Sequence, residues 1–295
     1  MHTPFHRPFF PGLTVRFWGV RGSIPTPEDG FLGVGGNTAC VEVRAADGTT
    51  LVLDAGTGIR ALGYALAAEA AGQPGEVHLA LSHFHWDHLQ GLPFFAPLYT
   101  PGQTVRFYAA TDDDRIHALL RGQMTSPYFP VPFGDLAAST ETVRVRDGEP
   151  FQVGPMTVQP FPVNHPQGAH GFRIEVDGAV LVYATDYEHG SAAHDEGLRE
   201  VSRGADLLIS DAQYTPDEYA LRQGWGHTTW EHATGLATSA GVGRLLLGEE
   251  RLVERLPRLV DRLVLALGHR RLVGGRGPRL ARLAPAGGAR VEPAH

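Results

Sequence analysis

The stretch Ser82-His83-Phe84-His85-Trp86-Asp87-His88 decides both the fold and the chemistry of this chain. It directly follows Val77-His78-Leu79-Ala80-Leu81, which has the composition of a buried strand. Three imidazoles and a carboxylate at a strand end are typical of a two-ion zinc centre rather than one closed tetrahedral site. The alternative is a His-rich surface loop, because 15 of the 295 residues are His. Chance explains four fixed positions poorly, so we expect a metal-dependent hydrolase.

The composition is typical of a loop-rich α/β enzyme with a sizeable core, since 42% of residues are hydrophobic and the chain holds 37 Gly and 22 Pro. Cys40 is the only cysteine, which excludes an intrachain disulfide. The first residues lack a secretion signal, and no apolar run approaches the roughly 20 residues of a membrane span. We therefore expect a cytoplasmic protein without a membrane partner.

Charge is distributed unevenly along the chain. Ten Arg and three acidic residues give residues 251–295 a formal charge of +7, which leaves −14 for residues 1–250 because the whole chain carries −7. An acidic body argues against tight binding of duplex nucleic acid by the core.

The pattern of apolar runs and turns predicts two successive strand-rich halves, each ending in metal-type residues. Such an order indicates a two-sheet sandwich with outer helices, and no linker divides residues 12–248. We expect strands over 13–20, 40–44, 50–54, 77–81, 104–109, 142–145, 156–160, 171–176, 180–184 and 206–210. We expect helices over 59–71 and 113–124, near 191–203, and one that opens over 87–92.

Four further polar residues lie just past predicted strands: His165, Asp186, Asp211 and His227. A single His or Asp in a turn is more often a cap or a solvated group. Beside the His83 to His88 cluster, however, His165 and Asp186 become candidate ligands. Strand ends on one side of a sandwich converge, so these side chains can meet.

Two ions about 3.5–4 Å apart need a bridging ligand, and Asp186 can offer one oxygen to each ion. We expect the first ion on His83, His85 and His165, and the second on Asp87 and His88. A water shared by both ions would lose a proton near neutral pH and become the attacking hydroxide. Asp54 is suited to accept the second N–H of a ligand imidazole, or alternatively to cap a turn or helix.

These residues, in this order, resemble the metallo-β-lactamase superfamily over roughly residues 13–248. The resemblance implies an α/β fold, the αββα four-layer sandwich. The segments around Asp186, Asp211 and Gly226-His227-Thr228 resemble the phosphodiesterase branch, which includes ribonuclease Z and cyclic-phosphate phosphodiesterases. The segments 17–25 and 35–38 resemble a bacterial group of this branch with poorly defined substrates.

The resemblance also implies catalytic roles. In that branch the His of the Gly-His-Ser/Thr motif protonates the leaving oxygen, and an acidic residue of the preceding motif orients it. We transfer these roles to His227 and Asp211, and we count Asp87 as a third catalytic candidate. A carboxylate raises the pKa of a paired imidazolium, which suits a proton donor. The alternative for His227 is a cap of the helix expected to begin near Thr228.

The end of the chain departs from the family pattern. A His-His-Asp-Pro-like segment should supply the last ligand of the second ion, but Glu249 stands where that His is expected. Either Glu249 replaces it, or His269 folds back to serve, or the family's ending has been replaced and the second ion binds weakly. We favour the third. The expected domains are therefore a hydrolase domain over 1–250 and an atypical Arg-rich helix and tail over 251–295.

The leading functional hypothesis is a phosphodiesterase with two Zn²⁺ per chain, or Mn²⁺, acting on a nucleotide, a cyclic phosphate or an RNA end. A thioester hydrolase of the glyoxalase II kind and a metal-binding scaffold with impaired activity are the alternatives. Residues 104–150 are a candidate substrate-facing insertion, in which Tyr128, Phe129 and Phe133 either stack on a base or merely cover the sandwich edge. A homodimer is a candidate assembly.

Overall fold

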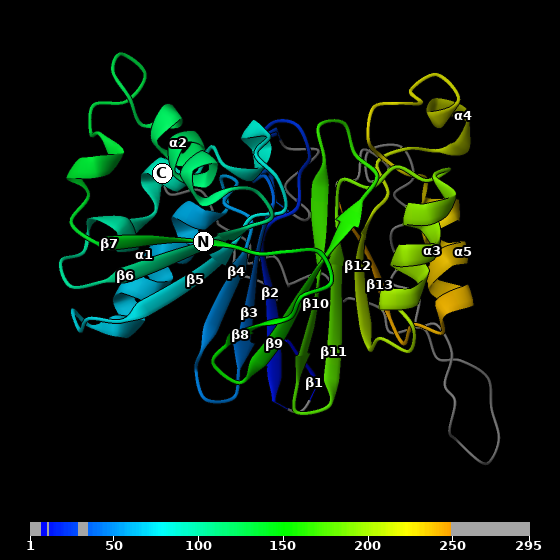
Figure 1. The fold of residues 1–295 in the computed structure, drawn as a ribbon, viewed down its shortest axis with the longest axis horizontal. Coiled ribbons are helices and arrows are strands. Elements are labelled where there is room, and N and C mark those ends of the chain that lie inside the picture. The colour runs from blue at the N-terminus through cyan, green and yellow to red at the C-terminus, as the bar shows by residue number, and fades with distance from the viewer. Residues whose placement is uncertain (1–6, 11, 29–34, 249–295) are drawn as a thin grey trace, which may run out of the picture.

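Two mixed β-sheets form the inner layers of the molecule (Figure 1). The computed structural model describes residues 7–10, 12–28 and 35–248. The first sheet has seven strands, which lie side by side in chain order: β1 (Arg7–Phe10), β2 (Leu13–Gly19), β3 (Cys40–Ala45), β4 (Thr50–Leu53), β5 (Glu76–Ala80), β6 (Thr104–Ala109) and β7 (Ser139–Arg144). Pairing is antiparallel from β1 to β4 and parallel from β4 to β7.

The second sheet has six strands in the reverse of chain order: β13 (Leu245–Gly248), β12 (Leu207–Asp211), β11 (Ala179–Ala184), β10 (Ala169–Val176), β9 (Met156–Val163) and β8 (Phe151–Val153). β8 to β11 pair antiparallel and β11 to β13 pair parallel. β9, β11 and β12 therefore run in one direction and end at the same edge of the sheet.

Apolar side chains from both sheets pack against each other in a central core, in which Val15 and Leu51 of the first sheet join Val158 and Phe172 of the second. Burial of these side chains, worth about 1.5–3 kcal/mol each, holds the inner layers together. The alternating burial along β2 is the usual pattern of a strand that buries one face.

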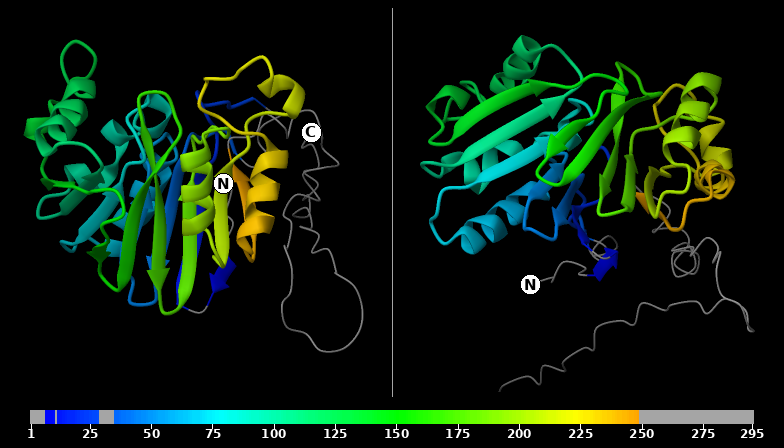
Figure 2. Two further views of the ribbon diagram at one scale, coloured as in Figure 1. Left: turned by 45° about the vertical axis from the view of Figure 1, so that its right-hand side comes forward. Right: turned by 60° about the horizontal axis from the view of Figure 1, so that its bottom comes forward.

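Helices cover the outer faces of both sheets (Figures 1 and 2). Leu62 of α1 (Ile59–Ala70) and Ile116 of α2 (Asp113–Gln123) join the core on the outer face of the first sheet. Leu198 of α3 (Ala192–Val201) and Leu236 of α5 (Trp230–Ala240) do the same on the second sheet. The short α4 (Pro216–Tyr219) lies in the segment between β12 and α5. The expected αββα sandwich is confirmed.

The predicted helix over 87–92 is wrong. Two 3₁₀ turns, Trp86–His88 and Leu92–Phe94, take its place. Ala55 N–H donates to His88 O at 2.7 Å, and Gly91 N–H donates to Ala55 O at 3.0 Å. Because Ala55 takes up these backbone groups and Pro93 has no N–H to donate, an α-helix cannot propagate. The 3₁₀ geometry keeps this segment close to the end of β4.

Residues 104–150 are not an insertion as a whole, because β6 and β7 are integral strands of the first sheet. Only the segment between these strands is additional to the sheet. Within it, Phe133 is buried against Phe107 and so cannot stack on a base. Phe129 packs edge-on against Phe94, with ring centroids 5.7 Å apart, whereas Tyr128 is 81% exposed. Tyr128 is therefore the aromatic side chain of this segment most available to a ligand.

Sequence analysis missed β1, β8 and α4, and it placed the start of β7 three residues too late. In the ranges that the structure describes, no helix has the length and apolar character needed to span a membrane. Glu249, His269 and the Arg-rich tail lie outside these ranges.

Candidate active site

The first candidate metal group unites the two sheets. His83 and His85 follow β5, and His165 follows β9; one ring nitrogen of each lies within 4.8 Å of the others. His165 Nε2 lies 3.2 Å from His85 Nδ1. This is the set that sequence analysis assigned to the first ion.

The second group consists of His83, His88 and Asp186, all of them buried. Asp186 follows β11 and directs its two oxygens differently. Oδ2 lies 3.0 Å from His88 Nε2, whereas Oδ1 lies 3.7 Å from His83 Nε2 and 3.8 Å from His165 Nε2. Because one oxygen faces each group, the carboxylate has the placement of a bridging ligand.

Each of the four imidazoles has one ring nitrogen engaged by the protein, while the other points towards the ligand groups. The engaging contacts are His83 Nδ1 with Ser82 Oγ (3.0 Å), His85 Nε2 with Gln167 Oε1 (3.1 Å), His88 Nδ1 with Asp54 Oδ2 (2.8 Å) and His165 Nδ1 with Gly226 O (2.9 Å). Such contacts fix the ring orientation of metal-ligating His.

The donor set fits a divalent cation. Imidazole nitrogens and carboxylate oxygens are zinc-type ligands. His83 Nε2 is buried and has no hydrogen-bond partner in the described part of the chain. A buried polar atom without a partner is costly, and a cation would remove that cost. We conclude that these groups are suited to hold a divalent metal ion.

The carboxylate of Asp54 holds the loop from His83 to His88 in place through hydrogen bonds. Its buried carboxylate accepts hydrogen bonds from Ser82 N (2.8 Å), Ser82 Oγ (2.9 Å) and Tyr183 OH (2.8 Å), in addition to His88 Nδ1. Asp54 and Asp186 both adopt positive φ, 62° and 53°, a strained region in which functional residues are concentrated. The expected contact of Asp54 with the imidazole of a candidate ligand is thus observed for His88.

The charges of the second group are strongly coupled. Burial opposes a positive charge on His88, but Asp186 and Asp54 outweigh it and hold the pKa of His88 well above its ordinary value. Burial and the neighbouring His88 hold the pKa of His83 well below its ordinary value. Burial disfavours the Asp186 carboxylate, yet His88 and His83 hold its pKa well below the usual range. The carboxylate is thus kept ionised, as a metal ligand requires.

Asp87 lies at the margin of this centre and outside both groups. Its Oδ2 accepts a hydrogen bond from Ser23 N at 2.7 Å and lies 3.5 Å from His88 Nε2. Although burial opposes the charge, these contacts with His88 lower the pKa of Asp87 to about 2. Asp87 thus lies beside its expected partner His88, and the structure adds His83 to the residues around the expected place of the second ion.

His227 and Asp211 form a buried pair beside the first group. His227 Nδ1 lies 2.6 Å from Asp211 Oδ2, and the ring of His227 meets that of His165 with centroids 5.7 Å apart. Asp211 is fully buried, and its Oδ1 accepts hydrogen bonds from the Gln213 and Thr228 amides. The alternative role of His227 as a helix cap is not observed, because Thr229 caps α5 through its Oγ1.

Comparisons with known proteins agree with this geometry. Residues 49–248 match the model of the beta-lactamase superfamily domain. An uncharacterized protein of Mycobacterium leprae is 33% identical over 248 residues, which cover 80% of this chain and 77% of that protein. The chain belongs to the metallo-β-lactamase superfamily.

Two further superfamily members match at lower identity. A ribonuclease Z of Bradyrhizobium is 24% identical over 286 residues, covering 78% of this chain and 87% of that enzyme. The metallo-beta-lactamase fold protein YhfI of Bacillus subtilis superposes with a TM-score of 0.62 at 21% identity, over 85% of this chain and 92% of that chain. This likeness to YhfI shows the fold.

Sequence analysis missed two residues of this metallo-β-lactamase site, Glu188 and His189, which follow Asp186 in the same loop. Glu188 accepts hydrogen bonds from backbone amides of the segment that precedes His227, and His189 Nδ1 lies 2.7 Å from Thr228 Oγ1. An acidic residue two positions after a ligand was the available signal. Its partners in the segment before His227, however, are backbone amides, and nearly any residue type can supply such an amide.

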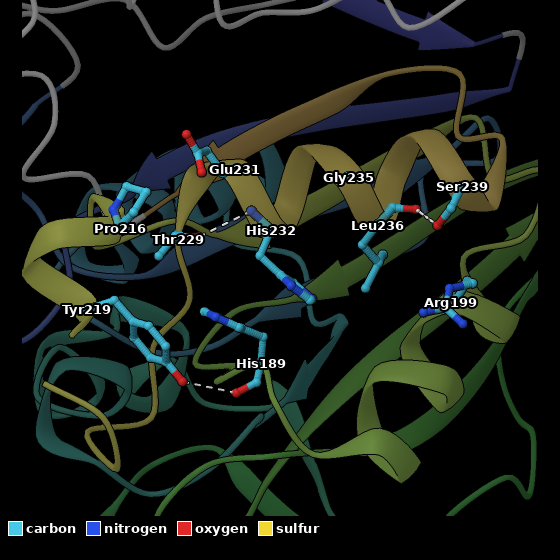
Figure 3. A pocket seen from close by; sticks show the side chains of 10 residues that line it. All are labelled: His189, Arg199, Pro216, Tyr219, Thr229, Glu231, His232, Gly235, Leu236 and Ser239. Carbon is cyan, nitrogen blue, oxygen red and sulfur yellow. Dashed lines mark hydrogen bonds between the residues drawn. The ribbon is translucent and has the colours of Figure 1, made fainter.

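His189 also lines a pocket of 570 Å³ behind the pair, between α3 and α5 (Figure 3). The rings of His189 and His232 stack there with centroids 4.4 Å apart, and Tyr219 packs against His189 from the other side. Burial lowers the pKa values of both His189 and His232, which favours neutral rings. Through the contact of His189 with Thr228 Oγ1, the wall of this pocket reaches the residue that follows His227.

Proposed function

We propose that this chain is a metal-dependent phosphodiesterase that cleaves a small diester, such as a cyclic nucleotide or another cyclic phosphate. The observation that carries the proposal is the buried His227 and Asp211 pair beside the ligand His165. Displacement of an alkoxide from phosphorus needs a proton at the leaving oxygen, and a carboxylate-paired imidazolium supplies one.

The likeness to ribonuclease Z of Bradyrhizobium supports this class of reaction. A diphosphatase of the PhnP family shares the fold, with a TM-score of 0.62 at 21% identity over 86% of this chain and 93% of that chain. Among these chemistries we favour a small diester, because residues 1–250 carry a formal charge of −14 against the +7 of the tail. An acidic body repels a long polyanion more than it repels a single phosphodiester.

We assign Zn²⁺ to the two groups, with Mn²⁺ as the substitute. His83, His85 and His165 would hold one ion; His83, His88 and Asp186 surround the place of the second. When bound, such ions supply Lewis-acid stabilisation and lower the pKa of a water molecule. We expect the second ion to bind more weakly than the first. His83 and the bridging Asp186 are shared, so the described part of the chain offers the second ion His88 alone and the first ion His85 and His165.

The protein's own groups divide the remaining work. His227, oriented by Asp211, donates the proton to the leaving oxygen. Asp87, which lies beside His88, would accept a hydrogen bond from the attacking water and orient it. Tyr128, which is exposed, is our candidate for contact with the part of the substrate away from the phosphate.

A thioester hydrolase would use the same metal groups on a carbonyl carbon. It has no comparable need for the His227 pair, because a thiolate is a good leaving group without protonation. A scaffold without activity has no need for the pair at all. These alternatives therefore differ from the proposal in what they require of His227.

The test compares two substrates on the protein loaded with Zn²⁺ or Mn²⁺: bis(4-nitrophenyl) phosphate and a glutathione thioester. We expect turnover of the diester, a metal content of at least one ion per chain, and higher activity when metal is added. Faster turnover of the thioester would assign the chain to the glyoxalase II kind. Full metal content with no turnover of either substrate would support the scaffold.

A further inference from the structure

Glu188 is a buried carboxylate whose described partners are two backbone amides and one hydroxyl. Gly224 N donates to Oε1 at 2.6 Å, Gly226 N donates to Oε2 at 2.7 Å, and Tyr219 OH donates to Oε1 at 3.2 Å. Only 7% of the residue is exposed. Hydrogen bonds from amides to an ionised carboxylate are among the stronger ones in proteins, so this contact can fix a loop.

The loop so fixed leads directly into the active site. Gly224 and Gly226 both adopt positive φ, 84° and 88°, and a Cβ on Gly226 would lie 2.2 Å from His165 Nδ1. The Gly226 carbonyl accepts the Nδ1–H of His165 at 2.9 Å, and the next residue is His227. The peptide held by Glu188 therefore orients a metal ligand and carries the proton donor.

The backbone of Glu188 is anchored to the same centre. Glu188 N donates to Asn164 O at 2.8 Å, and Asn164 Nδ2 donates to Glu188 O at 2.9 Å. Asn164 immediately precedes His165. Residues 186–189 thus supply the bridging Asp186, the carboxylate of Glu188 and the contact of His189 with Thr228.

We propose that Glu188 is a positioning residue, which sets the ring orientation of His165 and the placement of His227 through the Gly224 to Gly226 segment. The proposal rests on the function assigned above for its catalytic consequence, but its geometry is independent of that function. Glu188→Gln is the informative change, because an amide NH₂ would face a backbone N–H where the carboxylate now accepts one.

Glu218→Gln is the matched control. Glu218 is also a carboxylate that accepts a backbone N–H, from Thr215 at 3.0 Å, in the same part of the fold. Its carboxylate contacts Thr215 in the capping box of α4. A general loss of stability in this region would affect both variants, whereas a positioning role is confined to Glu188.

The first measurement uses the metal-free full-length protein and needs no activity. Amide exchange and the ¹⁵N shifts of the His165 ring are compared in the wild type, Glu188→Gln and Glu218→Gln. We expect at least a tenfold faster exchange at Gly224 and Gly226, and a loss of the Nδ1–H form of His165, in Glu188→Gln alone. Wild-type behaviour of Glu188→Gln, or equal changes in Glu218→Gln, would overturn the proposal.

The second measurement uses metal-loaded protein and two diesters that differ in leaving group. Glu188→Gln should lower kcat about 10–100-fold on an alkyl ester, the range seen when a residue behind a ligand is lost, with little change in KM. The loss in kcat should be smaller on a nitrophenyl ester. The kcat of Glu188→Asp, which retains the charge, should lie between those of the wild type and Glu188→Gln. Equal losses on both esters contradict a role through His227.

Wild-type protein that cleaves no diester would refute the proposed function, while the exchange and tautomer data would still test Glu188. Should Glu188→Gln fail to fold, the same readouts on Glu188→Asp decide the matter. In that variant the shorter side chain must weaken the contacts with Gly224 and Gly226 and shift the His165 tautomer in part. An unshifted tautomer would refute the proposal.

Discussion

The two sheets contribute to the active site in different ways. The first sheet delivers His83, His85, Asp87 and His88 from one loop after β5, over a single buried support, Asp54. The second sheet delivers His165, Asp186 and Asp211 from three separate strand ends. A contiguous loop can be recognised in a sequence, whereas scattered residues depend on long-range contacts such as that between Gly226 and His165.

Different kinds of contact hold the two halves of the site in place. Asp54 acts on the first half through the side chains of Ser82 and His88 and through the Ser82 amide. Glu188 and Asp211 act on the second half largely by accepting backbone N–H groups. We therefore expect a change of Asp54 to affect metal binding and a change of Asp211 to affect proton transfer.

The largest expected effect is that of His83→Ala, because His83 belongs to both metal groups. Loss of Lewis-acid stabilisation worth several kcal/mol should lower the rate on bis(4-nitrophenyl) phosphate by at least about 10³-fold. Metal analysis should show depletion at both groups, whereas His85→Ala, which touches only the first, should retain part of the metal. Equal metal content in His83→Ala and wild type would break the assignment.

Asp54→Asn and Asp211→Asn form the next comparison. Asp54→Asn should weaken metal binding by about 10–100-fold, because it removes the acceptor for His88 Nδ1. Asp211→Asn should leave metal affinity unchanged and slow the cleavage of an alkyl diester. Titration with a chromogenic chelator measures the first effect, and steady-state kinetics measures the second. If Asp211→Asn lost metal as well, the division of roles between Asp54 and Asp211 would not hold.

The segment between β6 and β7 allows a smaller effect to be measured. Tyr128→Ala should raise KM for a nucleotide more than for an aryl phosphate, since base stacking contributes roughly 1–3 kcal/mol. Phe133→Ala, in contrast, should lower the free energy of unfolding by about 3–5 kcal/mol without such selectivity, because Phe133 is buried. Equal changes in KM for both substrates in Tyr128→Ala would indicate that Tyr128 does not contact a base.

The smallest effect concerns Cys40, which lies fully buried on β3. Burial raises the pKa of its thiol well above the ordinary value, with further contributions from Asp54 and Glu42. At pH 8 the group is therefore a buried, neutral thiol, and Ellman's reagent should react with it only after denaturation. Removal of metal should not change this, because the apolar core holds the first sheet. Rapid labelling of Cys40 in the metal-free protein would show that metal binding is needed to keep the first sheet closed to the reagent.

The fold and most members of the candidate metal groups could be predicted because they are encoded in local patterns. The run after Leu81 identified the loop, and residues just past predicted strands identified His165, Asp186 and Asp211. The grouping could not be predicted in detail: neither the place of His83 in both groups nor the contact of Asp87 with the Ser23 amide can be recognised in the sequence. Glu188 was missed for the same reason, since a contact with a backbone amide requires no particular side chain as its partner.

The central claim is that the second sheet supplies a proton donor to a phosphodiester. The most direct test is the cleavage rate of diesters of graded leaving-group pKa by wild-type protein and by His227→Ala, with metal content measured on the same samples. We expect full metal content and a loss of about 10²–10⁴-fold for poor leaving groups that shrinks towards nitrophenolate. A loss that is equal for all leaving groups and accompanied by loss of metal would contradict the account.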